Sequence, residues 1–173
     1  MDRRSLIKNA GIVGVLTAGP APAVHAHAVV RGRLASSFPK SLDTIYGSAE
    51  VFAKAVKEMS GGKFEVSVHA AGELIPAFGV VDGVQNGTVE MAHTAPYYFF
   101  GKNGAFAIRG AIPFGMNSRQ LTAWIVDGNG GKLMREFYAK YSIINLMGGN
   151  TGAQMGGWFR KEFKTPVDIK GWT

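Results

Sequence analysis

The chain has 173 residues, of which 46% are hydrophobic and 18% charged, with a formal net charge of +7 and no cysteine. This is ordinary globular composition for one domain with a real core, and the lack of cysteine excludes disulfides, thiolate metal sites and a lipid-anchored N-terminal cysteine. The basic residues are scattered, apart from a small group near the C-terminus, so the sequence predicts no nucleic-acid partner.

Residues 1–28 have the order of an export signal. Residues 2–8 (DRRSLIK) form a twin-arginine arrangement, in which an arginine pair precedes an apolar pair and a lysine. Residues 10–23 are apolar and small, but this stretch is too short, and too rich in Gly and Pro, to span a membrane. Residues 26–28 (AHA) offer small residues at both positions that a signal peptidase reads, which predicts a mature periplasmic chain beginning at Val29.

The mature chain begins with alternating strand and helix patterns. Residues 30–37 predict a first strand, and residues 64–69 alternate apolar and polar side chains as a short, half-buried strand does. Between them, apolar residues recur at helical spacing from Leu42 to Met59, with Ser41 as the predicted N-cap and Gly61-Gly62 as the stop. This alternation favours an α/β lobe with a largely parallel sheet.

Weaker elements follow the second strand. Residues 77–86 predict a helix that two glycines interrupt and Gly87 ends, and residues 88–94 predict a third strand. In open α/β sheets, ligands bind beyond the carboxyl ends of the strands. The loops after the first and third strands, residues 36–40 and 95–102, are therefore the expected places for a binding site.

The last part of the chain leads into a glycine-rich segment. Ser118 is the predicted N-cap of one helix, a second amphipathic helix follows, and the apolar run 143–147 predicts a strand. Five glycines within residues 148–157 then remove side chains, so that another backbone or a small ligand can come close. The amides Asn150 and Gln154 stand among them. Two interpretations remain open: a hinge between two lobes, or a hinge that also presents Gln154 to a ligand.

Four consecutive aromatic residues occupy positions 97 to 100, in the loop after the third strand. Four such rings cannot all face one side of a regular element. At least one of Tyr97 and Tyr98 should therefore line a surface or a cleft and use its hydroxyl there, whereas Phe100 is assigned to the core. Phe38, beside the rigid Pro39 at the end of the first strand, has two interpretations: a ring held over a pocket, or a core side chain.

The sequence lacks the signatures of common enzymes. A phosphate loop needs a glycine five residues before its Gly-Lys pair and a Ser or Thr directly after it, and Gly131-Lys132 has neither. No G-x-S-x-G or H-E-x-x-H motif occurs. Beyond the leader, His69 is expected on a solvated strand face and His93 as a neutral, hydrogen-bonded core residue. With no paired nucleophile and base, the sequence predicts no enzyme. An exported α/β enzyme or cofactor-binding protein is kept as the alternative, because twin-arginine export carries folded proteins.

Three stretches resemble the substrate-binding proteins of tripartite ATP-independent periplasmic (TRAP) transporters, in particular the members that bind 2-oxo monocarboxylic acids. They are residues 34–44 (LASSFPKSLDT), 87–102 (GTVEMAHTAPYYFFGK) and 148–161 (GGNTGAQMGGWFRK). Proteins of this family are about twice as long, because they consist of two α/β lobes of ordinary domain size. The resemblance therefore implies the N-terminal lobe of a two-lobed, type II periplasmic-binding-protein fold, in a C-terminally truncated chain.

The resemblance also implies domain boundaries and a function. Residues 1–28 would be the leader, residues 29–147 the N-terminal ligand-binding lobe, and residues 148–173 a hinge strand with the start of an incomplete second lobe. Such a protein captures a small organic acid, here a 2-oxo monocarboxylate, for a membrane permease driven by an ion gradient, and catalyses nothing. The resemblance implies no required cofactor, although a Na⁺ or Ca²⁺ ion bridges the substrate carboxylate in some members, and it allows a homodimer.

Five site residues follow from the resemblance. Gln154 matches a position that touches the substrate, or the metal ion that bridges it. Tyr97, Tyr98 and Phe38 match positions near the cleft, and Asn150 lies by it.

One family feature has no match in this sequence. The family pairs the substrate carboxylate with an arginine a few residues beyond the segment that residues 168–171 resemble, a bidentate geometry suited to a guanidinium. Only Trp172 and Thr173 follow here, and Arg160 is not a motif match for that role. Without this arginine and a second wall, the chain as written is expected to bind no carboxylate tightly.

Overall fold

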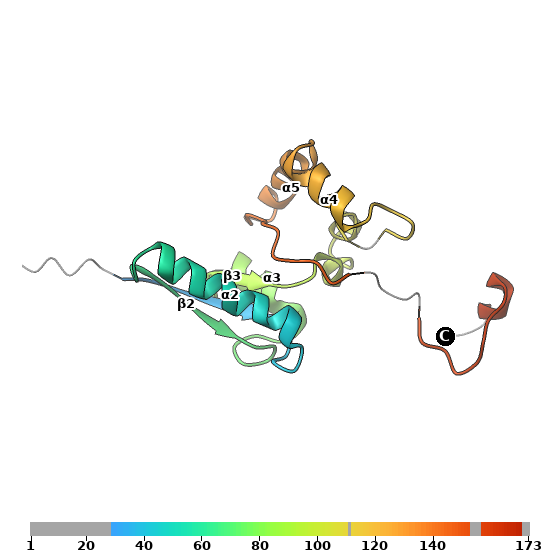
Figure 1. The fold of residues 1–173 in the computed structure, drawn as a ribbon, viewed down its shortest axis with the longest axis horizontal. Helices are drawn as coiled ribbons and strands as arrows, with labels where there is room; N and C mark the ends of the chain where they lie inside the picture. Colours follow the sequence, from blue (N-terminus) through green and yellow to red (C-terminus); the bar gives the residue numbers. More distant parts are fainter. Residues whose placement is uncertain (1–28, 111, 153–156, 171–173) are drawn as a thin grey trace, which may run out of the picture.

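The computed structural model describes residues 29–110, 112–152 and 157–170 (Figure 1). In chain order the elements are β1 (Val30–Ser36), α2 (Asp43–Met59), β2 (Phe64–His69), the 3₁₀ turn η1 (Ala77–Gly79), α3 (Val80–Gln85), β3 (Met91–His93), the 3₁₀ turns η2 (Pro96–Phe99) and η3 (Gly104–Ala107), α4 (Ser118–Val126), α5 (Gly130–Ala139) and the 3₁₀ turn η4 (Pro166–Ile169). The predicted leader lies outside the described residues. No helix within the described ranges is long and apolar enough to cross a membrane.

The three strands form one parallel sheet in the order β2-β1-β3. On one edge of β1, Val30 pairs with Phe64; on the other, Leu34 pairs with Met91 and Ser36 with His93. The carboxyl half of β1 is buried, as expected for a central strand that is covered on both faces. The predicted α/β architecture with a parallel sheet is confirmed.

Helix α2 lies along the sheet and packs against β1 and β2 (Figure 1). It begins one residue later than predicted. The carbonyl of Leu42, not of Ser41, accepts the first helical hydrogen bonds, from the backbone N–H groups of Ile45 and Tyr46. Asp43 places a negative charge in the first turn, where it interacts favourably with the positive end of the helix dipole. The predicted stop is confirmed, because Gly61 and Gly62 both take positive φ values, which few other residues adopt easily.

The buried core joins the sheet to the helices that follow it. Its members come from β1, α3, the loops around β3 and helix α5: Ala35, Val80, Val81, Val89, Phe99, Phe106, Met134 and Tyr138. Phe106 is its centre, with ring centroids 5.0 Å from Phe137, 5.5 Å from Tyr138 and 5.0 Å from Tyr141. Burying a side chain of this size stabilises the fold by about 1.5–3 kcal/mol. Pairs of aromatic rings at these separations add further attraction.

Several predicted boundaries shift because local hydrogen bonds compete with the regular element. Strand β3 is shorter than the predicted 88–94, because the backbone N–H groups of Thr88 and Val89 donate to Gly83 at the end of α3 instead. The predicted helix at 77–86 is split into η1 and α3. Helix α4 is capped by Asn117, one residue before the predicted Ser118, since Asn117 and Gln120 form a reciprocal capping box.

Two predictions near the end of the lobe are wrong. Phe100, assigned to the core, is 63% exposed, whereas its neighbour Phe99 is 3% exposed. The aromatic run forms the 3₁₀ turn η2, whose tight rotation turns the two successive rings in different directions. Residues 143–147 form no strand, because none of the described strands pairs with them. Ile143 still packs on the core, while Ile144 and Leu146 are 85% and 79% exposed.

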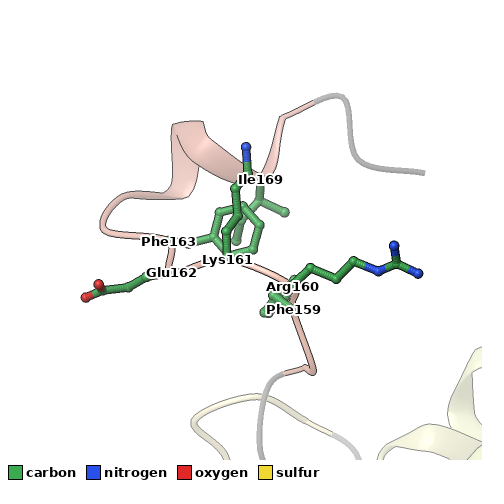
Figure 2. A pocket seen from close by; sticks show the side chains of 6 residues that line it. All are labelled: Phe159, Arg160, Lys161, Glu162, Phe163 and Ile169. Atoms are coloured by element: carbon green, nitrogen blue, oxygen red, sulfur yellow. The ribbon is translucent and has the colours of Figure 1, made fainter.

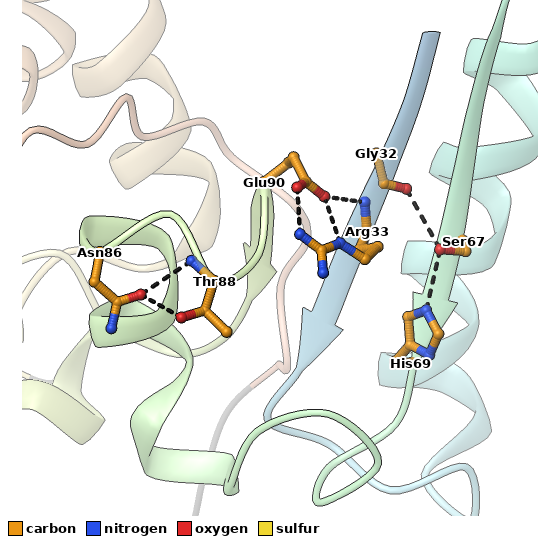
Figure 3. Close-up of polar contacts among 7 residues, drawn as sticks. All are labelled: Gly32, Arg33, Ser67, His69, Asn86, Thr88 and Glu90. Atoms are coloured by element: carbon orange, nitrogen blue, oxygen red, sulfur yellow. Dashed lines mark hydrogen bonds and ion pairs between the residues drawn. The ribbon is translucent and has the colours of Figure 1, made fainter. Parts of the chain in front are cut away.

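An ion pair fastens the start of β3 to β1. The Glu90 carboxylate accepts hydrogen bonds from the Arg33 backbone N–H at 2.7 Å, from Nε at 3.0 Å and from Nη2 at 2.6 Å (Figure 3). The bonds from the Arg33 side chain are the largest cause that lowers the pKa of Glu90, to about 2 from its usual 4.5. The pair is exposed, so it adds only a modest amount to stability, and it also fixes the register of the two strands.

Replacing Glu90 by Gln should lower the urea midpoint of unfolding at pH 7. Because the folded pKa of Glu90 is depressed, the stabilisation is complete above pH 4.5 and is lost as the pH falls from 4.5 towards 2, where the parent carboxylate is also protonated. The midpoints of parent and variant should therefore converge over that window in urea melts followed by circular dichroism. Glu58→Gln is the matched control, since its contact with Lys54 is 3.9 Å long and exposed. Equal shifts for the two variants at pH 7 would contradict a specific role for Glu90.

Candidate functional site

The carboxyl ends of β1 and β3 meet at one edge of the sheet, because the two strands are parallel and adjacent. The backbone N–H of Ser37 donates to the His93 carbonyl at 2.8 Å and so extends the contact beyond the paired strands. The Ser37 hydroxyl lies 2.6 Å from both the Ala77 carbonyl and the Thr94 hydroxyl. These bonds hold the two predicted loops, 36–40 and 95–102, against each other at the edge where α/β sheets bind ligands.

Four aromatic side chains lie together here, three from these loops and one from η1: Phe38, Tyr97, Tyr98 and Phe78. We call them the aromatic wall. The Tyr98 ring lies 4.9 Å from Tyr97, 5.2 Å from Phe78 and 6.1 Å from Phe38. Phe38 is buried, with its ring 5.1 Å from His93, while both tyrosines are half-buried. The structure therefore brings together three of the five residues predicted for the site, Phe38, Tyr97 and Tyr98.

Tyr98 is suited to donate a hydrogen bond to an anion. Burial is the largest cause that raises the pKa of Tyr98, and the neighbouring Tyr97 raises it further. The phenol consequently keeps its proton at neutral pH. Its ring lies against Phe38 and, edge to face, against Phe78, and these contacts restrict the orientation of the phenol.

His93 lies at the carboxyl end of β3, behind the wall. Its Nδ1 is 3.1 Å from the Ser36 hydroxyl and its Nε2 is 3.3 Å from the Ser48 hydroxyl. Burial lowers the pKa of His93, so the ring is neutral and hydrogen-bonded, as predicted. The contact with Ser36 is not a nucleophile–base pair, because Ser36 is 0% exposed and cannot reach a substrate. His69, expected on a solvated face, is instead half-buried. Its Nε2 lies 3.0 Å from the Ser67 hydroxyl (Figure 3). Its Nδ1 lies 3.8 Å from the Glu73 carboxylate.

The glycine-rich segment passes beside His93. A Cβ atom added to Gly148 would lie 3.9 Å from Cδ2 of His93, which is ordinary van der Waals contact. Asn150, predicted to lie by the cleft, is exposed, and its amide oxygen accepts a hydrogen bond from the Gly152 N–H at 2.7 Å. Gln154, predicted to touch the ligand or a metal ion, lies outside the described residues.

Two of the hollows on the described chain lie away from this wall. One is a groove of about 750 Å³ along α2, which includes Ser48 and reaches Gly148. The other, of about 470 Å³, is formed by residues between Phe159 and Ile169 (Figure 2). Figure 2 shows that Arg160 and Glu162 point away from the ring of Phe163, in different directions. Neither hollow is lined by Tyr97 or Tyr98.

The described residues contain no group of three His, Asp or Glu side chains that could hold a metal ion. The polar groups around the wall are instead hydroxyls and backbone carbonyls. Oxygen atoms of this kind suit Na⁺ or Ca²⁺ better than a transition metal, but they need carboxylate or amide oxygens beside them. The described residues around the wall therefore do not by themselves make a complete ion site.

The sequence did not single out Ser36 and Ser48, the hydrogen-bond partners of His93. Ser36 and His93 are opposite each other in the β1–β3 register, although 57 residues separate them in the chain. The register between these strands is the information that would have identified the pair.

Comparison with known proteins identifies the family. A family model described as bacterial extracellular solute-binding protein, family 7, matches residues 35–173. A monocarboxylate 2-oxoacid-binding periplasmic protein of Nostoc sp. (strain PCC 7120) is 49% identical over 142 residues, which cover 82% of this chain and 39% of that protein.

Solved structures of TRAP solute-binding proteins have the same fold. One from Bordetella bronchiseptica, a dimer with calcium and picolinate in one site and the other site empty, is 47% identical with a TM-score of 0.79, and the match covers 83% of this chain and 43% of that one. One from Pseudoalteromonas atlantica with sodium and pyruvate is 41% identical, with a TM-score of 0.78 and coverage of 83% and 44%. One from Colwellia psychrerythraea with calcium and pyruvate is 38% identical, with a TM-score of 0.78 and the same coverage.

This chain thus spans about two fifths of the length of these relatives. The predicted resemblance to TRAP solute-binding proteins is confirmed, and the α/β sheet with its helices corresponds to part of their fold. With a family model matched over residues 35–173, the chain belongs to family 7 of the bacterial extracellular solute-binding proteins.

Proposed function

We propose that this chain forms the N-terminal lobe of a periplasmic TRAP solute-binding protein that captures a small 2-oxo monocarboxylate. The captured acid is passed to a membrane permease that an ion gradient drives. The observation that carries this proposal is the likeness, over 83% of the chain, to two solved TRAP proteins that hold pyruvate. The name of the Nostoc relative, which refers to 2-oxoacids, supports the same substrate class.

The lobe contributes one wall of the binding cleft. The Tyr98 hydroxyl, kept protonated and held by neighbouring rings, would donate to a carboxylate or keto oxygen of the ligand. Tyr97 and Phe38 complete the apolar part of this wall. Residues 29–147 make up the lobe, and residues 148–173 form the hinge and the start of a second lobe that supplies the opposite wall. Asn150 would lie by the cleft and Gln154 would reach the ligand from the hinge.

An ion belongs to this proposal as an accessory to the ligand. The solved relatives hold calcium or sodium together with picolinate or pyruvate. When bound, Na⁺ or Ca²⁺ would neutralise the ligand carboxylate, and the Gln154 amide oxygen is the proposed contact of this chain to it. A homodimer is also proposed, on the likeness to the Bordetella dimer. An exported enzyme is the less supported alternative. Of the two serines that contact His93, Ser36 is buried, and the hydroxyl of Ser48 donates to the Ile45 carbonyl instead of to the ring.

The leader is proposed to direct twin-arginine export and to be removed after Ala28. Its arginine pair, apolar stretch and AHA sequence motivate this expectation. N-terminal sequencing of protein released from the periplasm should begin at Val29. An intact Met1 terminus, recovered only from the cytoplasm, would show that residues 1–28 are not a cleaved signal.

Gln154→Ala should weaken binding of pyruvate by the whole protein, with its second lobe. Removing a buried polar group leaves its partner unpaired, which costs about 1–3 kcal/mol, or roughly a 5- to 150-fold loss of affinity. Isothermal titration calorimetry of parent and variant measures this directly. Gln85→Ala, at the exposed end of α3, is the matched control and should bind like the parent. Unchanged affinity for Gln154→Ala would make Gln154 part of the hinge only.

Residues 29–173 alone should bind pyruvate only weakly. Small-ligand sites owe their affinity to burial of most of the ligand surface, and one wall leaves the anion in water. Calorimetric titration of the purified monomer with pyruvate and longer 2-oxo acids checks this expectation. Saturable micromolar binding would show that a single lobe suffices.

A further inference from the structure

A directed chain of hydrogen bonds crosses the lobe behind the aromatic wall. The Ser48 hydroxyl lies 2.6 Å from the Ile45 carbonyl, so its single hydrogen is donated there. Ser48 can therefore only accept from Nε2 of His93, which is 3.3 Å away. Burial keeps His93 neutral, and a neutral imidazole carries one N–H. The hydrogen is therefore on Nε2.

The rest of the chain follows from this tautomer. With its hydrogen on Nε2, His93 accepts at Nδ1, and the donor is the Ser36 hydroxyl at 3.1 Å. The Ser36 oxygen in turn accepts from the backbone N–H of Phe38, also at 3.1 Å. Four hydrogen bonds thus run in one direction, from Phe38 through Ser36, His93 and Ser48 to the backbone of α2. We name them the His93 relay.

Protonation of His93 would break the order of the relay. An imidazolium donates at both nitrogens, so Ser36 could no longer donate to Nδ1. Among the described residues, the Ser36 hydroxyl has hydrogen bonds only to His93 and Phe38, and Ser36 is fully buried. Its hydroxyl hydrogen would be left without an acceptor, which is costly in a buried position.

The groups around His93 do not offset that cost. β1 and α2 present the hydroxyls of Ser36 and Ser48 to the ring. The charged residues Asp43, Glu50 and Lys54 line the same groove as Ser48, yet burial is the only cause that shifts the pKa of His93. In the described part of the chain, no charged side chain forms a hydrogen bond or an ion pair with the His93 ring.

The relay begins at a residue of the aromatic wall. Its first donor is the backbone of Phe38, whose ring stands between His93, at 5.1 Å, and Tyr98, at 6.1 Å. We propose that His93 is a positioning residue: its Nε2–H tautomer holds Phe38 and Tyr98 in the arrangement that accepts the ligand, and protonation of His93 loosens them. The proposal rests on the proposed function for its ligand, but the relay itself can be tested without one.

Nuclear magnetic resonance on the purified chain tests the relay first. Long-range proton–nitrogen spectra should show the hydrogen of His93 on Nε2, and the Phe38 amide resonance should shift with the protonation of His93. Because the pKa of His93 is lowered, this shift should occur below pH 6.5. In Ser36→Ala, the Phe38 amide resonance should no longer shift when His93 is protonated. His69 is the internal reference, since its ring contacts Ser67 and Glu73 instead. A hydrogen on Nδ1, or a Phe38 amide resonance that does not shift when His93 is protonated, would overturn the relay.

Pyruvate binding by the whole protein then tests the positioning role. Affinity of the parent should fall as the pH drops through the pKa of His93, by up to about tenfold per pH unit, the limit for one proton. His93→Asn keeps an acceptor for Ser36 and does not titrate, so its affinity should stay near that of the parent at pH 7.5 and vary little with pH. His93→Phe should bind weakly at every pH, and His69→Asn should follow the parent.

These outcomes separate the two ideas. If the parent protein does not bind pyruvate at pH 7.5, the proposed function is contradicted. The spectra would still show whether the hydrogen bonds of the relay exist. Pyruvate binding by His93→Asn that falls with pH as steeply as the parent would overturn the positioning role and leave the proposed function intact.

Discussion

Both edges of β1 are hydrogen-bonded to parallel strands, and the rest of the described lobe depends on this pairing. Because β1 and β3 run side by side in the same direction, the two loops that leave their carboxyl ends emerge together. The Arg33–Glu90 pair fastens the start of β3, and the Ser37 contacts close its end. Without this double fastening, a three-residue strand such as β3 would have little to hold its register.

The helical part of the lobe supports the aromatic wall from the other side. Phe99, next to the two tyrosines, points into the core and contacts Phe106, which α5 surrounds with aromatic rings. The wall is therefore anchored at Phe38 by the strand end and at Phe99 by the core. A rigid, preformed wall suits a small anion, since few interactions are available to offset the cost of ordering loops on binding.

The segment after α5 leads into the proposed connection between two lobes. Ile143 packs on the core, Ile144 and Leu146 point to solvent, and Gly148 passes close to His93. This alternation is typical of a strand, yet no described strand hydrogen-bonds to it. The likeness to relatives more than twice as long agrees with such a connection. Gly148, in the proposed hinge, lies next to His93, so motion of this hinge and protonation of His93 would affect the same side chains.

The sequence by itself determined the α/β alternation, the extent of β1 and α2, the glycine stop after α2 and the family likeness, because each depends on periodicity, on turn residues or on motifs that are local in the chain. Only the tertiary structure decided that Phe99 is buried and Phe100 exposed, since a 3₁₀ turn replaced a regular element. It also decided that residues 143–147 are not a strand, since a strand exists only with a partner. The contacts of His93 with Ser36 and Ser48 join residues that are 57 and 45 positions apart in the chain. They depend on the pairing of β1 with β3 and on the packing of α2, and no local pattern carries that information.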